Sequence, residues 1–149
     1  MEYGCIGKKL GHSFSAVIHA KLGDYDYRLC ELTETELTEF MTKKDFKGIN
    51  VTIPYKEAVI PFLDHIDESA KKIGAVNTIV NRNGVLTGYN TDFYGMTELL
   101  KRGKVELADK NVFILGTGGT SKTARAVAKS LGARKIDVVS RNPQDGEIS

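Results

Sequence analysis

Short apolar segments alternate with amphipathic helical segments along the whole chain. Residues 3–7, 25–31 and 48–53 have the apolar and β-branched content of strands. Between the first two, apolar residues recur at helical spacing and predict a helix over residues 14–22, with Ser13 as its N-cap and with Phe14, Val17, Ile18 and Leu22 on one face. The first part of the chain therefore reads as strand, helix, strand.

Local signals define the elements that follow. Thr33, followed three residues later by Glu36, is a capping box that opens a helix extending to residue 43. Pro54 ends the third strand, and helical patterns cover residues 56–63 and 67–73. Asn83-Gly84 is a strong turn signal between two β-rich arms, residues 76–81 and 85–89, and predicts a hairpin. An amphipathic helix is expected over residues 92–102, ended by Gly103.

From residue 111 the pattern becomes a single βαβ unit. A strand is predicted over residues 111–115, a glycine-rich turn over 116–119, a helix over 120–131 and a strand over 135–140. The expected fold is α/β: a substrate domain with a mostly parallel sheet over residues 1–103, then an incomplete Rossmann-like domain over 104–149. Two strands would leave most of their apolar faces open, so either the chain continues in the natural protein or another polypeptide completes the sheet.

Composition and charge narrow the classes of partner. The 149 residues carry 21 basic and 19 acidic side chains, well interspersed, which gives no electrostatic footprint for nucleic acid. No signal peptide is seen, and no apolar run approaches the ~20 residues that span a bilayer. Cys5 and Cys30 lack metal-type spacing and are predicted to be buried, reduced thiols, so no metal and a cytoplasmic location are expected.

The glycine turn after the strand at 111–115 is a candidate cofactor loop. Gly116, Gly118 and Ser121 occupy the three positions of a dinucleotide fingerprint, with Thr117, Gly119 and Thr120 between them. The same residues read as G-x-x-x-x-S-K-T, one substitution from a P-loop, and a purely structural glycine turn is a third reading. The next strand ends at Ser140 and Arg141 without an acidic residue, which favours the 2′-phosphate of NADP over the ribose hydroxyls of NAD.

Four polar clusters lie at or beside predicted strand ends in the first hundred residues. They are Gly11-His12-Ser13-Phe14-Ser15, Asn50-Val51-Thr52-Ile53-Pro54-Tyr55-Lys56, Gly74-Ala75-Val76-Asn77-Thr78 and Tyr89-Asn90-Thr91-Asp92. Singly, each has an ordinary explanation, such as a helix cap for Ser13 or Asp92 and a surface lysine for Lys56. His19 and His65 read as ordinary helix-face residues.

Together the motifs G-H-S-x-S, N-V-T-I-P-x-K, G-A-V-N-T and N-T-D resemble the shikimate dehydrogenase family. The resemblance implies that Ser13, Ser15 and Thr52 bind the substrate carboxylate and that Asn77 binds ring hydroxyls. It implies that Lys56 and Asp92 form the catalytic pair at the reacting hydroxyl. The cofactor contacts implied are Gly116, Thr117, Gly118, Gly119, Thr120, Ser140 and Arg141, although both residues flanking Arg141 differ from the family's N-R-T motif.

The reaction implied is the reversible, NADP-dependent reduction of 3-dehydroshikimate to shikimate, in the pathway to chorismate and the aromatic amino acids. A buried lysine suits such chemistry because its neighbours can move its pKa towards neutrality. The resemblance makes this chain the front half of such an enzyme, expected to be inactive or nearly so alone, and it leaves a homodimer open. The alternatives are a quinate/shikimate dehydrogenase and a non-catalytic substrate-binding module.

Overall fold

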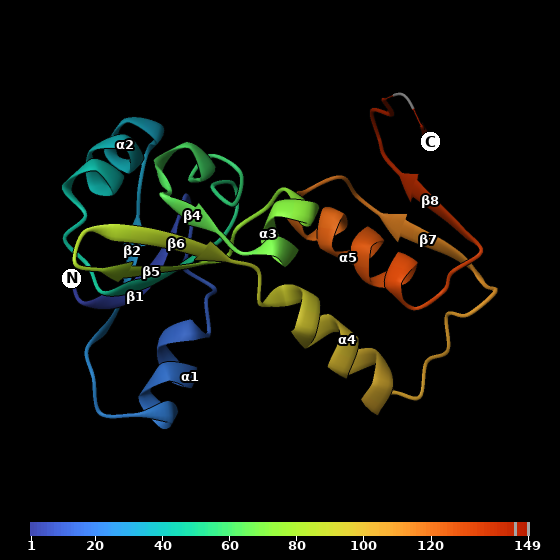
Figure 1. The fold of residues 1–149 in the computed structure, drawn as a ribbon, viewed down its shortest axis with the longest axis horizontal. Coiled ribbons are helices and arrows are strands. Elements are labelled where there is room, and N and C mark those ends of the chain that lie inside the picture. Colours follow the sequence, from blue (N-terminus) through green and yellow to red (C-terminus); the bar gives the residue numbers. More distant parts are fainter. Residues whose placement is uncertain (145, 149) are drawn as a thin grey trace. The chain divides into compact units, whose positions relative to one another are not determined.

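Two sheets organise the chain, one of six strands and one of three (Figure 1). The structure is a computed structural model that describes residues 1–144 and 146–148. Contacts within the chain divide it into two units, Met1–Asn90 and Thr91–Ser149, each of which contains one of the sheets.

The first unit is built on a mixed sheet with the strand order β2-β1-β3-β5-β6-β4. Strand β1 pairs in parallel with both β2 and β3, β4 pairs in parallel with β6, and β5 runs antiparallel to its two neighbours. The expectation of a mostly parallel sheet is confirmed. The strands are β1 (Tyr3–Gly7), β2 (Tyr27–Glu31), β3 (Gly48–Val51), β4 (His65–Ile66), β5 (Thr78–Arg82) and β6 (Val85–Tyr89).

One face of this sheet forms the core. Because side chains alternate between the two faces of a strand, Ile6, Ile49 and Ile79 project to the same side from three neighbouring strands. They are buried with Leu37 and Met41 of helix α2 (Glu34–Lys43). Helix α3 (Glu68–Ile73) adds Ala70 to the same cluster.

The opposite face carries helix α1 (Ser15–Leu22), which contacts β2. The predicted apolar face of this helix is not buried by the described residues: between 54% and 75% of the surface of Phe14, Ile18, Val17 and Leu22 is exposed. Helix α1 instead contacts the sheet through His19, whose ring stacks on Tyr27 with centroids 3.7 Å apart.

Elements with a local signal form where they were predicted. The Thr33 hydroxyl accepts from Glu36 N–H, and the Glu36 carboxylate accepts from Thr33 N–H, which is the reciprocal capping box. Asn83 and Gly84 adopt positive φ angles of 55° and 87° between β5 and β6, as a two-residue hairpin requires.

The predicted helix over residues 56–63 is wrong. This segment consists of turns and one short 3₁₀ helix, Ile60–Phe62, because Pro61 has no N–H with which to continue an α-helical ladder. The third strand ends at Val51, two residues earlier than expected. His65 lies in the short strand β4 and not on a helix face, and Cys30 is half-buried where a buried thiol was expected, whereas Cys5 is buried.

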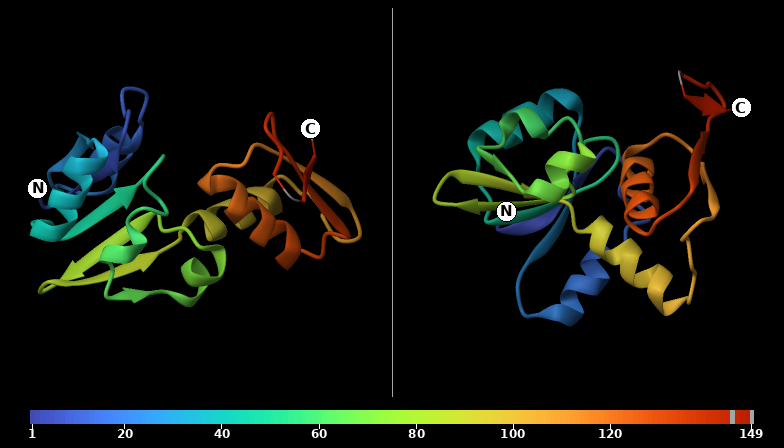
Figure 2. Two further views of the ribbon diagram at one scale, coloured as in Figure 1. Left: turned by 90° about the horizontal axis from the view of Figure 1, so that it is seen from above. Right: turned by 45° about the vertical axis from the view of Figure 1, so that its right-hand side comes forward.

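The second unit begins with helix α4 (Asp92–Arg102) and continues as β7 (Asn111–Leu115), α5 (Gly119–Ser130), β8 (Lys135–Val139) and β9 (Glu147–Ile148). Its three strands are all parallel, in the order β7-β8-β9. Helix α5 packs on β7 and β8 (Figure 2). It buries Val127 and Ala128. Helix α4 contacts α5 and therefore belongs to the second unit, so the boundary between the two units lies before α4. The domain boundary predicted from the sequence lay after residue 103.

One face of the second sheet is open, as the sequence predicted for an incomplete βαβ domain. Phe113 and Leu115 project from β7 away from α5, and 60% and 83% of their respective surfaces are exposed. None of the helices in the described part of the chain is long and apolar enough to cross a membrane.

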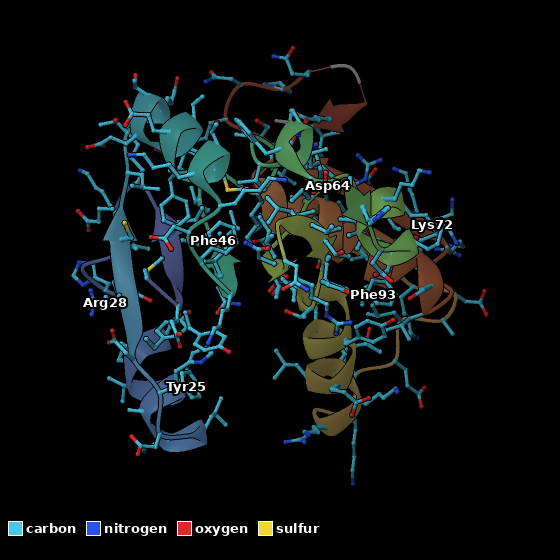
Figure 3. All side chains as sticks on the ribbon, turned by 60° about the vertical axis from the view of Figure 1, so that its left-hand side comes forward. Tyr25, Arg28, Phe46, Asp64, Lys72 and Phe93 are labelled. Atoms are coloured by element: carbon cyan, nitrogen blue, oxygen red, sulfur yellow. The ribbon has the colours of Figure 1, made fainter. Side chains whose placement is uncertain are left out.

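Asp64 connects three segments of the first unit (Figure 3). Its carboxylate accepts from Leu86 N–H of β6 at 2.8 Å and from the Lys44 ammonium, beyond the end of α2, at 3.2 Å. These hydrogen bonds, the one from Leu86 foremost, hold the pKa of the Asp64 carboxyl below its ordinary value.

We therefore expect Asp64→Asn to lower stability near neutral pH and to flatten its decline in acid. The pKa of Asp64 is lower in the folded than in the unfolded chain, where it is about 3.9. The carboxylate thus stabilises the fold above about pH 4, and this contribution is lost as the pH falls through the folded-state pKa. Urea unfolding of both proteins across this range tests the expectation, with the exposed Asp24→Asn as control. Parallel pH curves for wild type and Asp64→Asn would contradict it.

Candidate functional site

The predicted substrate residues lie on segments that meet at one edge of the six-stranded sheet. Strands β1, β3 and β6 end at this edge and β5 begins there. Backbone hydrogen bonds connect the segments: Thr52 N–H donates to Ile6 at 3.0 Å, Val51 N–H to Asn77 at 2.8 Å, and Asn77 N–H to Tyr89 at 3.0 Å. The motifs that carry Thr52 and Asn77 are thus attached directly to the ends of core strands.

Ser13 lies in the connection from β1 to α1, and Ser15 is the first residue of α1. Leu10 N–H donates to the Glu31 carboxylate at 2.6 Å, and Ser13 N–H donates to Leu10 at 2.8 Å, which ties this connection to the end of β2. The Ser13 hydroxyl accepts from Ser15 N–H at 3.3 Å. Ser13 is not the N-cap that the sequence predicted, because the helix starts one residue later with Phe14 in the cap position.

Lys56, the last residue of the second motif, is buried, with 8% of its surface exposed. Tyr55 N–H donates to Thr52 at 2.9 Å, which closes a turn after β3, and Val76 N–H donates to the Lys56 carbonyl at 2.8 Å. Burial raises the pKa of the Cys5 thiol on β1, and the positive charge of Lys56 opposes that rise. The positive charge of Lys56 therefore acts on strand β1 within the sheet.

Asn77 is also buried, and its amide is oriented by its neighbour. The Thr78 hydroxyl donates to Asn77 Oδ1 at 3.0 Å. The segment before Asn77 is held by Asn90, whose buried side-chain amide donates to the Ala75 carbonyl at 2.9 Å. The third and fourth motifs are thus joined by a side-chain hydrogen bond that sequence spacing alone did not indicate.

Asp92 is the first residue of α4 and belongs to the second unit. The structure brings together the segments of Ser13, Ser15, Thr52, Lys56 and Asn77 within the first unit. The pairing of Lys56 with Asp92 stays a prediction.

Three polar residues of this region were given no role in the sequence analysis: Tyr27 lay outside its motifs, and Asn50 and Thr78 lay within two of them. The Tyr27 hydroxyl donates to Asn50 Oδ1 at 2.6 Å, and Asn50 Nδ2 donates to the Thr78 hydroxyl at 3.3 Å. All three line a cavity of about 490 Å³ on the α1 side of the sheet, beside His19 and Tyr25. The polar Asn50 within the otherwise apolar strand β3 was the one signal in the sequence that could have suggested this cluster.

The glycine turn and the end of β8 form a second candidate site, within the second unit. Gly116, Thr117, Gly118, Ser140 and Arg141 line one cavity of about 700 Å³. Gly116 has a φ of 104°, which favours glycine, and Gly118 is the N-cap of α5 without a side-chain cap. The first turn of this helix, which includes Gly119 and Thr120, contains no acidic residue, so its N-terminal partial positive charge is available to an anion.

The residue at which α5 starts distinguishes a dinucleotide-binding turn from a P-loop. The helix begins at Gly119, which leaves a short turn of Gly116, Thr117 and Gly118 after β7. In a P-loop the loop extends up to the lysine, here Lys122, so that its backbone can wrap a phosphate. Lys122 lies inside α5, and the dinucleotide geometry is therefore favoured.

The end of β8 presents Arg141 as an exposed cation. Ser140 N–H donates to Ile148 of β9 at 2.8 Å, and the Ser140 hydroxyl accepts from Asn142 N–H at 3.2 Å, which shapes the turn. Asp137, the nearest acidic residue of this strand, is paired with Lys135 at 2.9 Å. No cluster of metal-ligating side chains occurs among residues 1–144 and 146–148.

Known proteins match the chain over almost its whole length. Shikimate dehydrogenase (NADP(+)) of Clostridium perfringens is 43% identical over 148 residues, covering 94% of this chain and 55% of the relative. The structure of shikimate dehydrogenase 1 from Peptoclostridium difficile superposes with a TM-score of 0.92 at 36% identity, over 99% of this chain and 58% of the other. The Thermus thermophilus enzyme, solved with NADP(H) and shikimate, gives 0.86 at 31% identity, covering 98% and 58%.

The chain thus spans about half the length of the relatives it matches. The family model of the shikimate dehydrogenase substrate binding domain matches residues 5–79, which include Ser13, Ser15, Thr52, Lys56 and Asn77. This match covers half of the chain, and it falls on the segments that meet at the edge of the six-stranded sheet. The chain belongs to the shikimate dehydrogenase family.

Proposed function

We propose that these residues provide the substrate-binding and catalytic part of an NADP-dependent shikimate dehydrogenase, an oxidoreductase that reversibly reduces 3-dehydroshikimate to shikimate. The observation that carries the proposal is the convergence of the predicted substrate residues at one sheet edge, around the buried Lys56. Shikimate has one carboxylate and three hydroxyls, which are natural partners for short hydroxyl and amide side chains.

The roles follow from the chemistry at the reacting carbonyl. Ser13, Ser15 and Thr52 hold the carboxylate end of the substrate, and Asn77 holds ring hydroxyls. Lys56 transfers the proton at the reacting oxygen and stabilises developing negative charge there, because its ammonium group is already held in a buried position. Asp92 orients Lys56 and balances its charge.

The cavity of the second unit is the proposed cofactor site, and the unit is the beginning of a Rossmann-like domain. When bound there, NADPH would supply the hydride for the reduction, and NADP⁺ would accept it in the reverse direction. Gly116, Thr117, Gly118, Gly119 and Thr120 would receive the pyrophosphate at the N-terminus of α5. Arg141 would bind the 2′-phosphate, with Ser140 holding the turn beside it. Cys5 and Cys30 are free, in keeping with the cytoplasm as the expected compartment.

Shikimate is favoured over quinate as the substrate, and catalysis over binding alone. Quinate enzymes of this family often vary the serines of the first motif or use NAD, whereas Ser13, Ser15 and Arg141 are all present here. Lys56 and Asp92, the proposed catalytic pair, are also both present, which favours a catalytic role over binding alone. A homodimer stays a prediction.

The direct test is a titration of the isotope-labelled 149-residue chain with shikimate, followed by NMR. We expect saturable shifts of the amides near Ser13, Thr52, Lys56 and Asn77, and weaker ones with quinate, because the binding side chains are already held at the sheet edge. A parallel assay with NADP and shikimate should show little or no turnover, since the chain spans 55% of its Clostridium perfringens relative. Shifts spread evenly over the surface, or none, would contradict the proposed substrate.

A further inference from the structure

A series of hydrogen bonds across the first sheet ends at Asn77, the proposed ligand of the ring hydroxyls. The Tyr27 hydroxyl donates to Asn50 Oδ1 at 2.6 Å, and Asn50 Nδ2 donates to the Thr78 hydroxyl at 3.3 Å. The Thr78 hydroxyl donates in turn to Asn77 Oδ1 at 3.0 Å. The three donors lie on strands β2, β3 and β5, and each donates to the next residue towards Asn77.

The chemistry of these groups determines the direction of donation. A hydroxyl has one hydrogen to donate, whereas a side-chain amide has an acceptor oxygen at one end and two N–H donors at the other. Because the Tyr27 hydroxyl donates to the oxygen end of Asn50, the amino end of Asn50 faces Thr78, and the Thr78 oxygen accepts from it. The single hydrogen of the Thr78 hydroxyl is then directed to Asn77 Oδ1.

The backbone around the last of these contacts is fixed by the sheet. Asn50 pairs with Thr78 in adjacent antiparallel strands. Val51 N–H donates to the Asn77 carbonyl at 2.8 Å, and Asn77 N–H donates to the Tyr89 carbonyl at 3.0 Å. Thr78 is β-branched, so its side chain has few rotamers. The Asn77 amide therefore meets a hydroxyl whose position is set by strand pairing, and such a restrained group can orient its neighbour.

We propose that Thr78 is a positioning residue of the substrate site: its hydroxyl fixes the Asn77 amide so that Asn77 meets the ring hydroxyls as a donor, through Nδ2. The proposal rests on the proposed function, because it takes Asn77 as a ligand of shikimate, and it assigns no substrate contact to Thr78. An amide held before the substrate arrives loses less entropy on binding. The direction of donation favours a substrate oxygen at this position over a protonated amine, which has no lone pair to accept with.

Thr78→Val tests the proposal because it removes the hydroxyl and keeps the branched shape of the side chain. The affinity of the 149-residue chain for shikimate is measured by NMR titration, and the χ1 rotamer of Asn77 in the ligand-free chain by three-bond couplings. We expect Thr78→Val to weaken shikimate binding about five-fold and to replace one Asn77 rotamer by an average over several. Thr78→Ser, which keeps the hydroxyl and loses the methyl group, should match wild type in both measurements.

A double-mutant cycle shows whether Thr78 acts through Asn77. In the Asn77→Ala background the positioned amide is absent, so that adding Thr78→Val should change shikimate affinity by less than about two-fold. If Asn77→Ala binds too weakly to titrate, the Asn77 couplings in Thr78→Val decide the question.

The matched control is Thr87→Val, which should leave shikimate affinity unchanged. Thr87 is a half-buried threonine of β6 that pairs with Val80 and so lies on the same face of the sheet as Thr78. Thermal unfolding shows whether each variant is folded, and Thr78→Ala takes the place of Thr78→Val if the latter is not.

The outcomes separate the inference from the function on which it rests. Wild-type affinity or an unchanged Asn77 rotamer in folded Thr78→Val would overturn the positioning role while the shikimate site stands. An equal loss in Thr78→Ser or in Thr87→Val would overturn it as well, and so would the same loss from Thr78→Val with and without the Asn77 side chain. A wild-type chain that does not bind shikimate would overturn the proposed function, and the inference with it.

Discussion

Replacing Lys56 with methionine is expected to lower the turnover number for shikimate oxidation by roughly 10²- to 10⁴-fold, with a much smaller effect on KM. The substitution keeps an unbranched side chain of similar length in the buried position but removes the group proposed to move the proton and to stabilise charge at the reacting oxygen. The assay uses an enzyme in which these 149 residues are joined to the part of the Clostridium perfringens relative that the match leaves out.

The matched control is Lys72→Met, which removes a lysine from the exposed surface of α3 (Figure 3). It should leave turnover unchanged, so that loss of positive charge as such is separated from loss of the buried ammonium. Circular dichroism shows whether Lys56→Met is folded. Turnover of folded Lys56→Met within a factor of about ten of wild type would exclude a proton-transfer role for this residue.

The second large effect concerns the choice of cofactor. Arg141→Ser in the same joined enzyme should lower kcat/KM for NADP roughly 10- to 100-fold, because a charge-assisted hydrogen bond to the 2′-phosphate is lost. The value for NAD should change little, since NAD has no phosphate at this position. Steady-state kinetics with both cofactors give the ratio directly.

Arg125, within helix α5 and outside the residues that line the cofactor cavity, offers the control, and Arg125→Ser should preserve the ratio. If Arg141→Ser lowered kcat/KM equally for NADP and for NAD, Arg141 would stabilise the turn after β8 and would not bind the 2′-phosphate.

The sequence could predict those parts of the fold whose cause is local. The capping box of Thr33 and Glu36 and the turn of Asn83 and Gly84 are complete within a few residues, and the structure confirms both. Strands β4 and β9 were missed, because each consists of two residues that are strand only through pairing with β6 and β8. The burial of α1 could not be predicted either, since helical spacing shows that an apolar face exists but not what covers it.

The residues of the candidate site likewise fall into those that local motifs reveal and those that only the fold brings together. Ser13, Ser15, Thr52, Lys56 and Asn77 could be proposed as site residues because they lie in short motifs that can be recognised along the chain. Tyr27 was not found, because its hydroxyl reaches a partner 23 positions away, across β1. Nothing in the neighbourhood of Tyr27 distinguishes it from an ordinary strand tyrosine; the register of the parallel strands makes the connection.

The convergence of separate loops on one sheet edge also has an evolutionary consequence. The buried residues Ile6, Ile49 and Ile79 pack the strands into the core, and they make no demand on the side chains beyond the strand ends. A lineage can therefore exchange Ser13, Thr52 or Asn77 one loop at a time, each change altering what the edge recognises while the packing beneath it is inherited unchanged. The hydrogen bonds that connect Tyr27, Asn50, Thr78 and Asn77 restrict this freedom for the Asn77 loop, because a change at one of these residues removes a partner of the next.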